Sequence, residues 1–243
     1  MTHYSPKTRE EILHQIKTDH FDVVVIGGGI TGAGIFRDAV YRGLKTLLIE
    51  KNDFASGTSS KSGKLIHGGL RYLKNFEIDL VWQSCRERHR LLKKIAPHIV
   101  FPIKFIIPFY RESKTPRWLV AIGLFLYDLL SAFRSIETFR ILSPAKLFAQ
   151  IKGIRQQLCH GALSYYDCAG LDYRLTIDTL KAGVEHHGCA LNYLEVKEIT
   201  ATASKNISIL MENNITGEKF SIAAKSVINA TGVWANQILE CAS

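Results

Sequence analysis

The chain has 243 residues, of which 47% are hydrophobic and 22% charged, proportions that are typical of a folded protein and exclude a disordered one. This length allows one good core, or one core with a small second lobe. The formal net charge of +9 suits anionic partners such as phosphorylated substrates or acidic lipid head groups; nucleic acid has only this charge in its favour, and we discount it.

The first elements of the chain are a lead-in and a buried strand. Residues 1–19 resemble neither a signal peptide nor a transit peptide, and we expect a short helix there. The β-branched run at 21–26 is too short for a helix and apolar enough for a buried parallel strand. A glycine turn, a helix over about 30–42 and a second strand at 44–49 follow, and that strand ends on Glu50.

The glycine turn matches the G-x-G-x-x-G fingerprint through Gly27, Gly29 and Gly32. The first glycine permits the tight turn, the second lets the backbone approach a pyrophosphate, and the third lets the helix pack close to the strand. Glu50 follows at close to the ~20-residue spacing expected of an acid that binds ribose hydroxyls. A lone fingerprint often arises by chance in a loop. Here it stands between two predicted strands, opens a helix and is followed by an acid at the expected spacing, so we predict an adenine-dinucleotide site.

Residues 51–73 are rich in glycine and small hydroxyl side chains, and we expect this loop to wrap the second half of the cofactor. A helix is expected over 76–95 and a strand over 103–109. The segment 118–130 is the most apolar of the chain, but as a helix it would span only about 20 Å of a bilayer core of about 30 Å. It is therefore either a buried helix or an interfacial one, and the sequence favours neither.

The last third of the chain returns to the dinucleotide pattern. We expect a short helix from Ser143, a turn-rich aromatic stretch over 160–174, a helix over 175–187 and a strand over 190–196. A hairpin over 206–223 and a buried strand from 226 would then lead into a tight turn suited to a second approach to the cofactor. Five cysteines without C-x-x-C spacing predict reduced thiols, a cytosolic compartment and no metal site.

Several blocks of the sequence resemble the FAD-dependent respiratory glycerol-3-phosphate dehydrogenases. The block at 64–73 is the most specific of them, and the matching blocks are residues 26–34, 57–60, 64–73, 96–98, 122–128 and 229–232. Members of that family are considerably longer than this chain. The resemblance therefore implies an N-terminal portion of such an enzyme.

The resemblance also implies a cofactor site for FAD. The residues implied to hold the ADP half are Gly27, Gly28, Gly29, Gly32 and Glu50. Hydrogen bonds to the pyrophosphate and ribityl chain would come from Thr58, Ser59 and Ser60. The isoalloxazine would lie along Leu65, Ile66 and His67, with Val196 near the adenine and Ala230 to Gly232 near the pyrophosphate.

The implied reaction is hydride transfer from C2 of sn-glycerol 3-phosphate to flavin N5, giving dihydroxyacetone phosphate, with electrons passed on to membrane quinone. Arg71 and Tyr72 would face the substrate, because a guanidinium fork binds a phosphate in a bidentate manner. His67 is a candidate for the base that removes the hydroxyl proton, but it could equally pack on the flavin. The base could also lie outside this chain.

We therefore predict an α/β fold: a doubly wound, Rossmann-like FAD-binding domain over 20–95 and 165–243, with an incomplete α+β substrate cap inserted at 96–164. The predicted partners are glycerol 3-phosphate, quinone and an anionic lipid surface, the predicted location is the cytoplasmic face of the membrane, and homo-oligomerisation is left open. The rival functions are an oxidase that uses oxygen, a non-catalytic FAD-binding fragment and, more weakly, an NAD-dependent dehydrogenase.

Overall fold

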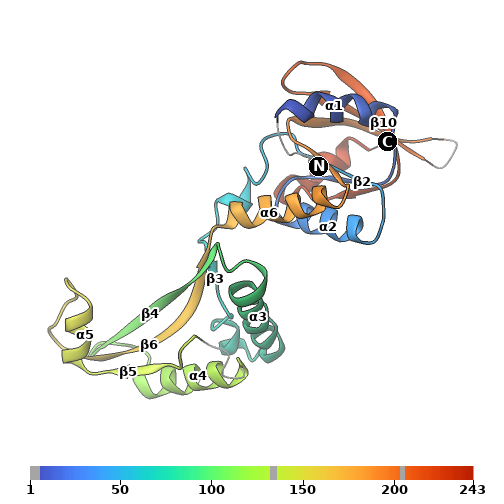
Figure 1. Ribbon diagram of the computed structural model, residues 1–243. Helices are drawn as coiled ribbons and strands as arrows, with labels where there is room; N and C mark the ends of the chain where they lie inside the picture. The colour runs from blue at the N-terminus through green and yellow to red at the C-terminus, as the bar shows by residue number, and fades with distance from the viewer. Residues whose placement is uncertain (1–5, 132–135, 203–205, 243) are drawn as a thin grey trace. The chain divides into compact units, whose positions relative to one another are not determined.

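The computed structural model describes residues 6–131, 136–202 and 206–242 (Figure 1). The chain forms two compact units: residues 1–62 with 172–243, and residues 63–171. These boundaries differ from the predicted ones, because residues 63–95 and 165–171 belong to the second unit. The reason is strand pairing, since Leu65 and Ile66 pair with Ala169 and Cys168 in a sheet of that unit.

The first unit is built on a six-stranded sheet with the order β7-β2-β1-β10-β9-β8. Strands β7, β2, β1 and β10 pair in parallel, whereas β9 pairs antiparallel with both β10 and β8. In chain order the strands are β1 His20–Ile26, β2 Thr46–Ile49, β7 Cys189–Leu191, β8 Leu194–Ala201, β9 Ile207–Asn213 and β10 Lys219–Asn229. This is the predicted doubly wound architecture, in which helices cover the parallel strands.

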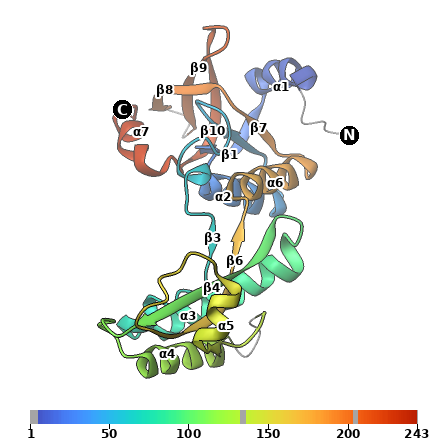
Figure 2. The ribbon, with the colours of Figure 1, turned by 90° about the vertical axis from the view of Figure 1, so that its left-hand side faces the viewer.

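The two faces of this sheet bury alternate residues of β1. Val23 and Val25 pack with Phe36 and Leu180, while Val24 packs on the other face in a cluster with Ile16. The helices are α1 Pro6–Thr18, α2 Ile30–Tyr41, α6 Asp172–Glu185 and α7 Ala235–Glu240. Figures 1 and 2 show α2 and α6 side by side on one face of the sheet and α1 on the other. The expected helical lead-in at 1–19 thus contains α1, whereas residues 1–5 of the lead-in lie outside the described part.

The C-terminal strands of this unit differ in detail from the expectation. The single strand expected over 190–196 is two strands, β7 and β8, in different positions of the sheet. The second arm of the expected hairpin and the strand from 226 are one continuous strand, β10. Since β10 runs parallel to β1 with Ile26 opposite Asn229, the residues that follow the two strands emerge together.

The second unit contains a sheet with the order β3-β6-β4, and β5 also pairs with β6. Its elements are β3 Leu65–Ile66, α3 Ile78–Arg90, β4 Val100–Tyr110, α4 Arg117–Leu130, β5 Arg140–Leu142, α5 Pro144–Gln150 and β6 Cys159–Gly170. The expectation of a turn-rich stretch over 160–174 was wrong, because most of these residues form the strand β6. Its glycines and its polar Asp167 weaken the local strand signal, whereas pairing along both edges stabilises it.

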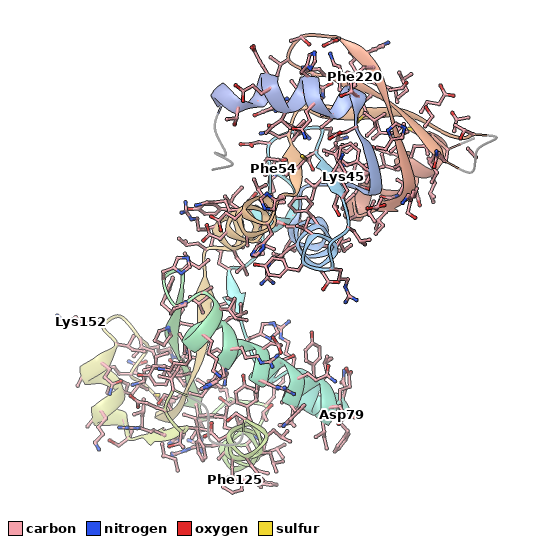
Figure 3. The ribbon with its side chains drawn as sticks, turned by 45° about the vertical axis from the view of Figure 1, so that its right-hand side comes forward. Lys45, Phe54, Asp79, Phe125, Lys152 and Phe220 are labelled. Carbon is pink, nitrogen blue, oxygen red and sulfur yellow. The ribbon has the colours of Figure 1, made fainter. Side chains whose placement is uncertain are left out.

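Helix α4, which covers the apolar segment expected over 118–130, has one buried face and one exposed face. Leu124, Tyr127 and Asp128 are buried against the unit. Large apolar side chains that are 40–64% exposed cover the rest of the helix: Trp118, Leu119, Ile122, Phe125, Leu126 and Leu129. Phe125 is labelled in Figure 3. Within the described ranges, no helix is both long and apolar enough to cross a membrane.

Candidate cofactor and substrate site

In the glycine turn after β1, two of the three fingerprint positions have no space for a side chain. Gly27 has a φ of +113°, and a Cβ atom there would lie 2.6 Å from the carbonyl oxygen of Ala230. A Cβ atom on Gly32 would lie 1.9 Å from the carbonyl oxygen of Gly27. The turn therefore brings β1, α2 and the end of β10 into backbone contact, as the fingerprint predicts.

Gly29 and Ser59 shape the N-terminus of α2. The hydroxyl oxygen of Ser59 accepts a hydrogen bond from the backbone N–H of Ile30 at 2.8 Å. A Cβ atom on Gly29 would lie 3.2 Å from that oxygen, so glycine at this position lets the Ser59 hydroxyl approach the helix end. The N–H groups of a first helical turn point outward at the positive end of the helix dipole, which favours a phosphate group.

Glu50 fixes the glycine turn from the neighbouring strand. Its Oε2 accepts a hydrogen bond from the backbone N–H of Gly28 at 2.7 Å, and its Oε1 accepts one from Asn52 at 2.8 Å. Each carboxylate oxygen has a second lone pair that these two contacts leave available. The acid that the sequence assigns to ribose thus also ties the end of β2 to the turn after β1.

These residues border a cavity of about 910 Å³ in the first unit. Nine of the predicted cofactor residues line it: Gly27, Gly29, Glu50, Thr58, Ser59, Val196, Ala230, Thr231 and Gly232. Three others support its wall instead. Gly28 faces Phe54 and Glu50, Gly32 packs on Gly27, and the Ser60 hydroxyl donates to the carbonyl oxygen of Gly57 at 3.3 Å.

The cavity also has lining residues that the sequence analysis did not single out. Trp234 packs on Gly57, where a Cβ atom would lie 3.1 Å from the indole ring, and the ammonium of Lys51 lies 5.7 Å from that ring. Asp172 accepts a hydrogen bond from the Ser62 hydroxyl at 2.6 Å. Lys51 and Trp234 adjoin recognised motifs and could have been found, whereas nothing in the sequence near Asp172 points to the cofactor.

The lining fits an adenine dinucleotide. The cavity volume is within the ~300–1,000 Å³ range of small-molecule sites. Gly29 borders the cavity with side-chain-free backbone that a pyrophosphate can approach, and Glu50 offers acceptors for ribose hydroxyls. Among the described residues, no group of three histidine, cysteine or acidic side chains is arranged to hold a metal ion.

The remaining predicted residues belong to the second unit. Leu65 and Ile66 form β3, His67 and Arg71 are exposed, and Tyr72 is half-buried. The backbone N–H of Gly69 donates to Nδ1 of His67 at 3.1 Å. Because Nδ1 accepts this bond, the neutral imidazole carries its proton on Nε2, which makes Nε2 a donor.

A buried polar cluster lies in the same unit as these residues. It consists of Arg88 from α3, Tyr127 from α4 and Asp167 from β6, all at most 3% exposed. Burial raises the pKa of the Tyr127 phenol above its ordinary value, so this hydroxyl remains a donor at neutral pH. Burial also raises the pKa of the Cys85 thiol beside it, and all five cysteines are free.

Comparison with known proteins agrees with this geometry. The family model described as "FAD dependent oxidoreductase" matches residues 22–242. A glycerol-3-phosphate dehydrogenase of Synechocystis sp. is 41% identical over 92% of this chain and 41% of its own length. The aerobic glycerol-3-phosphate dehydrogenase of Bacillus subtilis is 36% identical over 98% of this chain and 42% of its own length.

Solved structures give the same fold. The glycerol-3-phosphate dehydrogenase from Bacillus halodurans, solved in complex with FAD, matches with a TM-score of 0.75 and 28% identity over 98% of this chain and 39% of that one. L-alpha-glycerophosphate oxidase from Mycoplasma pneumoniae shares the fold at 17% identity and a TM-score of 0.65, over 93% of this chain and 57% of that one. This chain spans about two fifths of the length of the curated relatives. Since the family model matches nearly all of it, the chain belongs to the family of FAD-dependent oxidoreductases.

Proposed function

We propose that the protein containing this chain is an FAD-linked dehydrogenase that oxidises sn-glycerol 3-phosphate to dihydroxyacetone phosphate. The observation that carries the proposal is the 36–41% identity to glycerol-3-phosphate dehydrogenases across 92–98% of this chain. In this proposal the first unit binds FAD, and the second unit contains the beginning of the substrate cap.

The cofactor residues are assigned from the lining of the cavity. The pyrophosphate would lie against Gly27, Gly29 and the start of α2, with hydroxyl contacts from Thr58 and Ser59. Glu50 would accept from a ribose hydroxyl through its remaining lone pairs. FAD, when bound, supplies the acceptor for the hydride, and the protein supplies orientation and electrostatics.

The substrate residues are assigned from the segment after β3. The exposed guanidinium of Arg71 would bind the phosphate of the substrate in a bidentate manner, beside Tyr72. His67 would donate a hydrogen bond through Nε2, given that Nδ1 accepts from Gly69. The net charge of +9 favours an anionic substrate at long range.

We also propose that the enzyme is peripheral on the cytoplasmic face of the membrane and that quinone accepts its electrons. The exposed apolar side chains of α4 would enter the interface of an anionic bilayer. Two exposed cations, Arg111 and Lys114, and the half-buried Arg117 precede or begin the helix, where acidic head groups would attract them.

Anaerobic titration of the full-length, FAD-loaded protein tests the activity. We expect glycerol 3-phosphate to bleach the flavin band near about 450 nm, and glycerol or glycerol 2-phosphate to leave it unchanged. A yellow protein that no concentration of glycerol 3-phosphate bleaches would refute the proposal and identify a non-catalytic FAD binder. Peroxide formation in air without reduction of a quinone analogue would identify an oxidase instead.

Co-sedimentation with liposomes tests the membrane attachment. We expect the full-length protein to sediment with vesicles that contain phosphatidylglycerol, and Phe125→Glu to reduce this by about tenfold, because a charge on the interfacial face opposes insertion. Ile215→Glu is the matched control, since Ile215 is 61% exposed in the first unit. Equal recovery in the supernatant with and without anionic vesicles, or equal losses in both variants, would refute the attachment.

A further inference from the structure

One carboxylate oxygen in the second unit collects hydrogen bonds from three other elements. Oδ1 of Asp167 accepts from the backbone N–H of Gly68 at 3.0 Å, from the Tyr127 hydroxyl at 2.7 Å, and from Nη1 of Arg88. Nη1 of Arg88 also lies 2.8 Å from the Tyr127 hydroxyl oxygen. The cluster therefore joins α3, α4 and β6 to the loop that follows β3.

The hydrogen bond to Asp167 attaches the loop through the backbone of Gly68. A Cβ atom on Gly68 would lie 2.3 Å from the Tyr127 hydroxyl oxygen and 2.4 Å from the Cys85 sulfur. Gly68 and Gly69 are buried, whereas His67 and Arg71 on either side of them are exposed. A buried stretch of backbone thus lies between two exposed side chains to which the proposed function assigns roles.

Apolar contacts continue this attachment along the loop. Leu70, Tyr72 and Leu73 pack against the buried side chains of Val81, Cys85 and Tyr127. Gly69 has a φ of +80°, and a Cβ atom there would lie 2.4 Å from the Tyr72 ring. The turn between Gly68 and Tyr72 therefore requires a glycine at position 69.

A buried ion pair is an inefficient way to stabilise a fold, because desolvation of the two charges offsets most of their attraction. The side chains of Arg88 and Asp167 are 4% and 3% exposed, so both have lost their water. A carboxylate can do what a packed apolar side chain cannot, since it accepts the Gly68 N–H and fixes where that peptide lies. This orientation is the feature that distinguishes the cluster from ordinary core.

We propose that Arg88, Tyr127 and Asp167 are positioning residues, which hold the Gly68 peptide so that His67, Arg71 and Tyr72 keep the arrangement needed for oxidation of the substrate. This proposal rests on the proposed function. None of the three is a catalytic residue, because they act on the loop backbone from the buried side. Loosening of the loop would lower turnover, since small misplacements of positioning groups cost up to about a hundredfold in rate.

The test uses full-length, FAD-loaded protein with Asp167→Asn and Tyr127→Phe. Asparagine removes the charge that pairs with Arg88, and phenylalanine removes only the hydroxyl that joins Arg88 to Asp167. The control is Leu147→Ala, which opens a cavity in the same unit within a cluster that contains no residue of the loop. Four quantities are compared: the urea midpoint, FAD content, kcat and KM for glycerol 3-phosphate, and amide hydrogen exchange of the peptide over 65–73.

We expect both cluster variants to exchange about tenfold faster over 65–73 and to lose about tenfold or more in kcat/KM, with unchanged FAD content. Leu147→Ala should lower the urea midpoint without either change. Exchange over 65–73 that matches the parent in both variants, or that rises equally in Leu147→Ala, would overturn the proposal. If the parent protein does not oxidise glycerol 3-phosphate, the proposed function fails, and hydrogen exchange alone still decides whether the cluster holds the loop. Tyr127→Phe decides the outcome if Asp167→Asn does not fold.

Discussion

The carbonyl oxygen of Gly27 would lie 1.9 Å from a Cβ atom placed on Gly32. The absence of a Cβ atom at position 32 allows the first turn of α2 to approach the end of β1 this closely. The same approach brings the N-terminus of α2 to the cavity, so packing of the fold and binding of the cofactor depend on one pair of glycines.

Gly32→Ala should therefore abolish FAD binding and destabilise the protein by about 1–3 kcal/mol, the usual cost of overpacking. Gly34→Ala is the matched control on the same helix. A Cβ atom on Gly34 would meet nothing within 4 Å, so alanine should stabilise the protein by about 0.5–1 kcal/mol. The absorbance ratio of flavin to protein and urea unfolding measure the two effects; a yellow, fully stable Gly32→Ala protein would contradict the steric argument.

Glu50→Gln should weaken FAD binding by about tenfold. The amide keeps one oxygen acceptor, but it replaces the other with a donor that faces a backbone N–H, either Gly28 or Asn52. The control is Glu195→Gln, because Glu195 also lines the cavity but pairs with Lys197 at 2.7 Å. Fluorescence titration of apoprotein with FAD measures both dissociation constants. Equal affinities in the two variants would show that the Glu50 contacts do not matter for the cofactor.

Two substitutions at His67 separate a hydrogen-bond donor from a general base. Since Nδ1 accepts from Gly69 and Nε2 bears the proton, His67→Gln should retain activity within about tenfold, because its amide can donate in place of Nε2. His67→Asn can still accept the hydrogen bond from Gly69, but its shorter side chain has no donor at the position of Nε2. This variant should therefore lose more activity than His67→Gln. Stopped-flow measurement of flavin reduction gives both rates. A loss of about 10²–10⁴-fold in His67→Gln would instead identify His67 as the base.

Stability should fall at alkaline pH because burial raises the pKa of Tyr127 and Cys85 above their ordinary values. In the unfolded chain, the Cys85 thiol ionises at about pH 8.5 and the Tyr127 phenol at about pH 10. In the folded protein both groups stay protonated to higher pH. Their contribution is thus complete below about pH 8.5 and is lost as the pH rises beyond it. Urea midpoints between pH 7.5 and 10.5 should show this fall, with a shallower slope in Tyr127→Phe. Identical slopes in the parent and Tyr127→Phe would contradict it.

The glycine turn, the helix and the two strands around it could be read directly from the sequence. The constraints on Gly27 and Gly32 are steric and act within a few residues, so the residue types alone reveal them. The same holds for the start of α5, where Ser143 caps the helix as its sequence suggests. The position of Glu50 beside the turn also follows from the sequence, because Glu50 ends the strand after the turn and adjacent parallel strands end at the same edge of a sheet.

The buried cluster and the strand β6 depended on tertiary structure. Gly68 and Asp167 are 99 residues apart. In the sequence, Arg88 lies on an expected helix, Tyr127 in the most apolar segment and Asp167 in a stretch expected to be turn-rich, and nothing there links the three. The free energy that buries them comes from contacts among α3, α4 and β6, which no local pattern encodes. The sequence by itself thus determined that a dinucleotide can bind, because that requires room at a few neighbouring glycines. Only the tertiary structure decided which side chains contact the loop that follows β3, because that requires distant side chains to lose their water together.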